Sequence, residues 1–147
     1  MKFHRFFNLN RKKAKVRATS HFLVSTDIAI DSTDGAHIAY SYDGDDTLNY
    51  TWFDGSTWQH ETIHDYGSGD GFGTVSLALD SAGRPHIAHH NAIGGWVDYW
   101  WSEGGAWLWE PVVIGNAFSL ALDAAGVPHM GYANPGNGLW YASRSGS

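Results

Sequence analysis

A motif that occurs three times constrains the fold of this chain more than any other feature. Each copy has two apolar residues, one on either side of an Ala, then an Asp, and then a His six positions after that Asp. The copies span residues 27–40, 76–89 and 119–132, so they recur after 49 and then 43 residues. A period of this length is typical of folds in which one small unit of secondary structure stacks against its own copies.

The similarity between the copies continues beyond the motif. Each His is followed by a Tyr, and in the first two copies that Tyr is followed by a Trp and then by a Glu. The equivalent residues are Tyr50, Tyr99 and Tyr141, then Trp58 and Trp107, and finally Glu61 and Glu110. The third copy reaches Ser147 before another Trp occurs. We therefore expect three related units, of which the last is shorter.

Short strands and tight turns are predicted within each repeat. Apolar residues alternate around Ala78, which indicates a strand covered on both faces. The stretch Asp80-Ser-Ala-Gly-Arg-Pro supplies turn residues for a hairpin, and aromatic residues favour a strand over 97–101. A fourth strand is expected over 107–114, at the outer edge because Pro111 lacks an amide donor. No helical period follows residue 20, and four antiparallel strands per repeat predict an all-β chain of β-propeller blades.

The recurring Leu-Ala-Leu-Asp-Ser-x-Gly-x-Pro-His-Ile-Ala pattern resembles the blades of bacterial β-propeller repeat proteins. It is distantly similar to the sialidase-like Asp-box and WD-repeat groups, and the resemblance covers residues 22–147. An Asp-box reads Ser-x-Asp-x-Gly-x-Thr-Trp. In the nearest stretch here, Asp54-Gly-Ser-Thr-Trp58, the Asp directly precedes the Gly and lies too close to the Trp. No sialidase site is therefore carried over, and a degenerate sialidase-like or glycosidase-like propeller is kept only as an alternative.

The chain divides into a basic N-terminal arm, residues 1–20, and a propeller segment, residues 21–147. Blades are expected at about 26–74, 75–117 and 118–147, the last without its fourth strand. Three blades do not close a ring, because each blade must bury its faces against a neighbour. We expect self-association into a six-bladed homodimer, or a place beside neighbouring subunits of an assembly. A fragment of a longer propeller is the competing explanation.

Positive charge is concentrated in the arm. Seven of the nine Lys and Arg residues lie in the first 20 positions, and only Arg84 and Arg144 lie beyond them. Residues 15–22 align with the fourth strand of the second repeat, so the arm is predicted to supply the missing strand to the third blade of a neighbouring copy. Residues 1–17 have the charge to bind nucleic acid or an anionic surface. We favour instead their neutralisation by the acidic blades.

The three Asp and His pairs have a structural interpretation. Two such residues face each other across a hairpin, and a buried imidazole is tolerated when it is hydrogen-bonded. We predict an Asp–His contact in each blade, resembling that of WD-repeat blades, and no metal site. The pairs are Asp31 with His37, Asp80 with His86, and Asp123 with His129.

Aromatic residues near loops are the predicted ligand contacts, because an indole face can stack on a sugar ring or on a partner side chain. Trp96 and Trp109 have no Trp counterpart in the other repeats, so the symmetry of the fold does not require them. Trp58 and Trp107 are equivalent, and packing between blades is their default role. The candidate ligand-binding residues are Trp96, Trp109, Trp58, Trp107, Asn91 and Asn134.

These features predict a non-catalytic binding module, lectin-like in that it binds carbohydrate. The main alternative is a structural or protein-interaction subunit of a larger assembly, tethered by the basic arm. We expect no catalytic residues, metal or cofactor: the chain has no Cys, and no residue spacing fixes the carboxylate pair that glycoside hydrolysis needs.

No apolar run approaches the roughly 20 residues that cross a bilayer. No intact signal peptide is recognised, so the compartment is left open, extracellular if the chain is a mature fragment.

Overall fold

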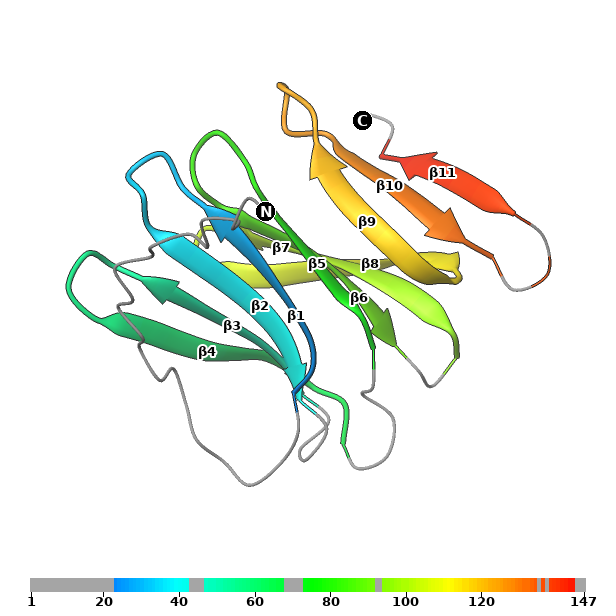
Figure 1. Cartoon of the computed structure of the whole chain (residues 1–147), viewed down its shortest axis with the longest axis horizontal. Helices are drawn as coiled ribbons and strands as arrows, with labels where there is room; N and C mark the ends of the chain where they lie inside the picture. Colours follow the sequence, from blue (N-terminus) through cyan, green and yellow to red (C-terminus); the bar gives the residue numbers. More distant parts are fainter. Residues whose placement is uncertain are drawn as a thin grey trace, which may run out of the picture.

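The computed structural model describes residues 23–42, 47–67, 73–91, 94–134, 136 and 138–144. These residues form eleven strands, arranged in three antiparallel sheets of four, four and three strands (Figure 1). Within the same ranges no residue is helical, and accordingly no helix suited to crossing a membrane is found there. The predicted all-β class is confirmed.

Each sheet is a meander in which every strand pairs with the next one in sequence. Blade 1 contains β1 (Leu23–Ile30), β2 (Ala36–Tyr42), β3 (Thr47–Phe53) and β4 (Trp58–Asp65). Blade 2 contains β5 (Val75–Leu79), β6 (Pro85–Asn91), β7 (Trp96–Glu103) and β8 (Ala106–Ile114). Blade 3 contains β9 (Asn116–Leu122), β10 (Pro128–Ala133) and β11 (Leu139–Ser143).

The first hairpin of each blade closes through the same tight turn. The third residue after the motif Asp has a positive φ in every blade, 64° at Asp34, 76° at Gly83 and 80° at Gly126. Glycine adopts this left-handed conformation without a Cβ clash, and aspartate is among the few other residues that tolerate it. The chain therefore reverses at the same point of each repeat.

The blades follow one another through their innermost strands, since β1 contacts β5 and β5 contacts β9 (Figure 1). The backbone amide of Leu77 donates to Oδ2 of Asp27 at 2.8 Å, and that of Leu120 donates to Oγ of Ser76 at 3.0 Å. Asp27 and Ser76 are equivalent residues, so both junctions use the same contact. This stacking is that of a partial β-propeller with three blades, as the repeat predicts.

Two apolar cores fill the spaces between successive blades. Between blades 1 and 2 the buried residues include Leu48, Tyr50, Leu77, Ile87 and Trp100. Between blades 2 and 3 they include Val97, Tyr99, Leu120 and Met130. Burial of one aliphatic side chain contributes about 1.5–3 kcal/mol. Contacts between blades are therefore a main source of stability for this fold.

The edge prediction for the fourth strand is also confirmed. Pro111 lies in β8, which is the outermost strand of blade 2. Residues 1–22 lie outside the described residues, and with them the predicted closing strand at 15–22. Among the residues that the structure describes, blade 3 ends with β11.

Candidate functional site

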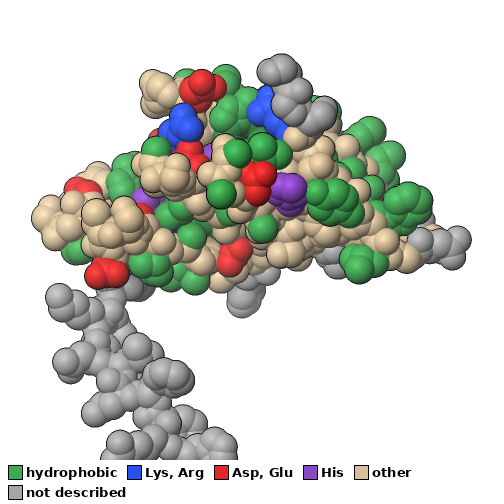
Figure 2. Space-filling view, turned by 90° about the horizontal axis from the view of Figure 1, so that it is seen from above, with side chains coloured by type: hydrophobic (Ala, Val, Ile, Leu, Met, Phe, Trp, Pro, Cys, Tyr) green, Lys and Arg blue, Asp and Glu red, His purple; other side chains and the backbone are tan. Residues whose placement is uncertain are grey.

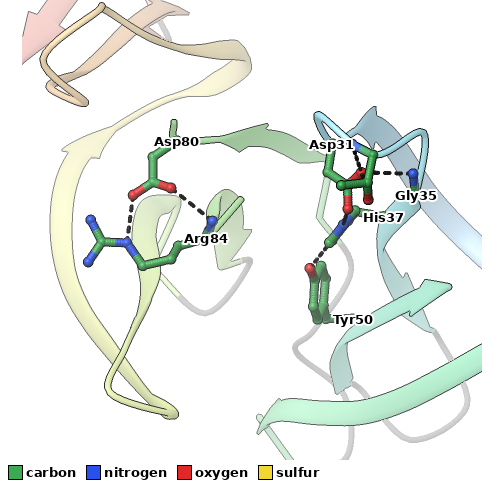
Figure 3. A network of polar contacts seen from close by, with 7 residues as sticks. Asp31, Gly35, His37, Tyr50, Asp80 and Arg84 are labelled. Atoms are coloured by element: carbon green, nitrogen blue, oxygen red, sulfur yellow. Dashed lines mark hydrogen bonds and ion pairs between the residues drawn. The ribbon is translucent and has the colours of Figure 1, made fainter. Parts of the chain in front are cut away.

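The motif Asp organises the turn of each hairpin. Asp31 accepts hydrogen bonds from the backbone amides of Thr33 at 2.7 Å and Gly35 at 2.8 Å (Figure 3). Its other carboxylate oxygen lies 3.1 Å from Nε2 of His37. The bond with His37, together with these amides, holds the pKa of Asp31 well below its usual range.

The second and third blades repeat this arrangement with wider spacing. Asp80 accepts the backbone amide of Arg84 at 2.8 Å and its Nε at 2.6 Å (Figure 3). From carboxylate oxygen to imidazole Nε2, the distance is 3.7 Å between Asp80 and His86 and 3.4 Å between Asp123 and His129. The structure thus places each predicted Asp opposite its predicted His.

Each of these His residues also contacts the Tyr of its own repeat. The Nδ1 to hydroxyl contacts are His37 with Tyr50, His86 with Tyr99 at 2.5 Å, and His129 with Tyr141 at 2.6 Å. Burial is the largest influence on His86 and lowers its pKa, against the attraction of Asp80, so this imidazole is neutral near pH 7. Within the described ranges, no three His, Asp or Glu side chains are placed to hold a metal ion. We interpret the contacts among these Asp, His and Tyr residues as structural contacts that hold the strands of one blade together.

Trp107 lies between blades 1 and 2, where its repeat position predicts it. Its indole N–H donates to Oε1 of Glu61 at 2.9 Å. Its ring meets Tyr50 edge-on, with 5.6 Å between the ring centroids. Both Glu61 and Tyr50 belong to blade 1, so one Trp joins the two blades through a polar and an aromatic contact.

The other predicted ligand contacts are distributed over all three blades. Trp96 and Trp109 are exposed, and Trp109 stacks on Trp100 with 5.6 Å between centroids. Trp58 is half-buried against Phe53. Asn91 donates to Oδ2 of Asp98 at 3.4 Å, and Asn134 is exposed after β10. The described residues do not bring these six into one site, and their ligand-binding role stays a prediction.

A pocket of about 260 Å³ opens between blades 2 and 3. Glu110 and Pro111 of β8 form one wall, and Met130 of β10 lies on the other. Arg144, directly after β11, and the buried Tyr99 also line the pocket. None of the six predicted ligand contacts lines this pocket.

The pocket exists because blade 3 departs from the repeat at two places. Trp100 of blade 2 pairs with Ile87, and the corresponding pair in blade 3 is Ala142 with Met130. The indole of blade 2 is therefore replaced by a methyl group. In addition, the described part of blade 3 has no counterpart of Trp107. No described side chain of blade 3 fills the space equivalent to the one that these two indoles occupy between blades 1 and 2.

Arg144 holds a fixed position at this pocket. Its Nε lies 3.3 Å from Oε1 of Glu110, and both side chains are half-exposed. The guanidinium carbon lies 4.6 Å from the centroid of the Trp101 ring, a cation–π contact. Its backbone amide donates to the carbonyl of Pro128 at 3.2 Å. The backbone bond positions the residue, and the contacts with Glu110 and Trp101 orient its planar group of hydrogen-bond donors beside a carboxylate.

The pocket combines donors, acceptors and apolar surface without net charge. Arg144 presents N–H donors and Glu110 presents acceptor oxygens. Burial raises the pKa of Tyr99 to about 12, so its hydroxyl stays protonated at neutral pH. The exposed Pro111 and the half-buried Val112 supply apolar contact area. Such a lining suits a small neutral ligand with several hydroxyl groups better than an ion.

A solved structure shares this fold. The structure of a fucose lectin from Kordia zhangzhouensis, in complex with methyl-fucoside, matches this chain with a TM-score of 0.54 and 18% sequence identity. The match covers 83% of this chain and 93% of that chain. No protein-family model matches the sequence, and no curated protein does. The similarity shows the fold, while the resemblance to sialidase and WD-repeat groups gains no support.

The sequence did not predict the pairing of Glu110 with Arg144. Two features of the sequence could have indicated these residues: Arg144 is one of two Lys or Arg residues beyond the arm, and Glu110 is equivalent to Glu61. The ion pair depends on how blade 3 stacks on blade 2, which the repeat spacing alone does not specify.

Proposed function

We propose that this chain is a non-catalytic, lectin-like carbohydrate-binding module that holds a monosaccharide unit in the pocket between blades 2 and 3. The ion pair of Arg144 and Glu110 at the pocket, in which the guanidinium of Arg144 lies over Trp101, is the observation that carries this proposal. The lectin fold of the similar structure supports it without identifying the sugar.

The chemistry of the pair suits a polyol. Adjacent hydroxyl groups of a sugar accept hydrogen bonds from the N–H groups of Arg144 and donate to the carboxylate of Glu110. The guanidinium plane is already ordered by Trp101, so little side-chain entropy is lost on binding. The less polar face of the sugar ring then lies against Pro111 and Val112.

The pocket also favours binding over hydrolysis. Glycosidases use two carboxyl groups, about 5–9.5 Å apart. Glu110 is the one acidic side chain among the residues that line this pocket. A second carboxylate for general acid or nucleophilic chemistry is therefore lacking among them, which is why we propose a lectin-like module.

A glycan array followed by titration calorimetry tests the proposal. We expect binding to a limited set of glycans, competed by the free monosaccharide. Glu110→Gln and Arg144→Gln weaken this binding by at least roughly tenfold, because each removes a charged hydrogen-bonding partner. The matched controls are Glu103→Gln, an exposed acid at the end of β7, and Arg84→Gln, an exposed residue that does not line the pocket. No glycan binding by the wild type, or equal loss in the controls, overturns the proposal.

A further inference from the structure

The first and last blades each expose a face whose equivalents are buried inside the molecule. Side chains at alternate positions of β5 and β9 point back toward the preceding blade. Leu77 is 6% exposed and Leu120 is 7% exposed, whereas the equivalent Ile28 of β1 is 59% exposed. Ile30, two residues further along β1, is exposed as well. We call this surface of blade 1, centred on Ile28 and Ile30, the head face.

Blade 3 exposes the complementary surface. Leu48 of β3 and Val97 of β7 have no solvent exposure, because they point toward the following blade. Their equivalent in β11, Leu139, is 88% exposed, and Tyr141 on the same side of that strand is exposed too. We call this surface, centred on Leu139 and Tyr141, the tail face. Figure 2 shows hydrophobic side chains gathered at the end of the molecule where the third sheet lies.

The backbone contact that joins successive blades is also incomplete at both ends. Between blades, an amide of the inner strand donates to a side-chain oxygen of the preceding inner strand, as Leu120 does to Ser76. The next acceptor in this series is Ser119, which is exposed on β9. The next donor is the amide of Ile28, which here bonds to Oδ1 of Asp27, its own neighbour in sequence.

We propose that the head face of one chain docks onto the tail face of a second copy of the same chain. The occupant is identified by the two junctions already inside the molecule, since the head and tail faces are the two halves of that same interface. The residues named for both faces are uncharged, so their burial leaves no unpaired ion. In the docked pair the amide of Ile28 donates to Ser119 of the next copy.

This contact is heterologous, because different surfaces of the two copies meet. Heterologous contacts form a closed ring when the rotation between copies permits, and otherwise an open filament. Two copies of three blades give six, within the range of about four to eight blades that propellers contain. The inference is independent of the proposed carbohydrate site, which lies within one chain.

Light scattering on the full chain and two exposed-site variants tests the interface. We expect the wild type at micromolar concentration to have twice the 16.2 kDa mass of one chain. Ile28→Glu places a charge on the head face, and Leu139→Glu places one on the tail face. Each substitution weakens association by roughly 30-fold or more. Leu108→Glu, on the outer strand of blade 2, is a matched exposed control that leaves the mass unchanged. Circular dichroism and melting verify that each variant is folded.

Mixing the two defective variants distinguishes a head-to-tail contact from a symmetric one. Ile28→Glu retains a tail and Leu139→Glu retains a head, so their mixture recovers a complex of one chain of each. A monomeric wild type overturns the proposal. So does a Leu139→Glu variant that associates normally, or a mixture that associates no more tightly than either variant does alone.

Discussion

The indole N–H of Trp107 in blade 2 donates a 2.9 Å hydrogen bond to the carboxylate of Glu61 in blade 1. One junction later the equivalent Glu110 faces Arg144 instead. The same carboxylate position thus serves as a packing contact between blades 1 and 2 and as part of an open polar pocket between blades 2 and 3. This difference between equivalent positions is the physical basis of the proposed ligand site.

Replacing Trp107 tests the packing role. Trp107→Phe keeps an aromatic ring near Tyr50 but leaves the part-buried Glu61 without its donor. We expect the free energy of unfolding to fall by about 1–2 kcal/mol. Urea denaturation measures this change. Trp109→Phe, on the same strand but exposed, serves as the control and is expected to lose less stability. Equal losses would assign the effect to indole area and not to the hydrogen bond.

The turn at Asp31 predicts a dependence of stability on pH. The pKa of Asp31 is lower in the folded state than in the unfolded chain, chiefly because of His37 and the turn amides. Its stabilising contribution is therefore present above the unfolded pKa of about 4 and is lost as pH falls below it. We expect a shallower acid-side loss of stability in Asp31→Asn than in the wild type, measured by thermal melts across that range. Ser32→Ala, an exposed and non-titrating position in the same turn, should retain the wild-type slope.

The Asp–His contacts are predicted to be structural and not metal-binding. Asp80→Ala removes the acceptor of two amides and of the Arg84 side chain. We expect a loss of roughly 1–2 kcal/mol in the free energy of unfolding. Added zinc is expected to leave the melting temperature of the wild type unchanged. A rise in melting temperature with zinc that disappears in Asp80→Ala would contradict the structural interpretation.

Residues 15–22 are predicted from the repeat to supply a fourth strand to blade 3 of another copy. Removal of residues 1–22 is then expected to weaken self-association, because it removes a strand pairing in addition to charge. Light scattering at low and high salt measures the effect. An unchanged mass would contradict the strand prediction. A loss confined to low salt would point to charge alone.

The sequence predicts the architecture well because each repeat contains its own turn and strand signals. Turn residues after Asp80, alternating apolar residues around Ala78 and an edge Pro111 agree on a four-stranded blade, and the structure confirms that arrangement. The pocket was not predicted, because it results from two departures from the repeat. A methyl group at Ala142 replaces the indole of Trp100, and such a change creates space only when the neighbouring blade is in place.

A Trp that is absent from the other repeats does not have to be a ligand contact. Trp109 has no Trp counterpart in the other repeats, yet its ring stacks on the buried Trp100. An unrepeated residue can therefore serve packing that is particular to one junction. The exposure of a Trp side chain and the residues that it contacts distinguish packing from ligand binding. The spacing of the repeats predicts neither.

A crystal structure of the chain with the monosaccharide selected by the glycan array would show whether the pocket between blades 2 and 3 binds sugar. We expect sugar density in this pocket, with ring hydroxyl groups within hydrogen-bonding distance of Arg144 and Glu110. Sugar bound against Trp96 or Trp109 instead, with this pocket empty, would contradict this expectation.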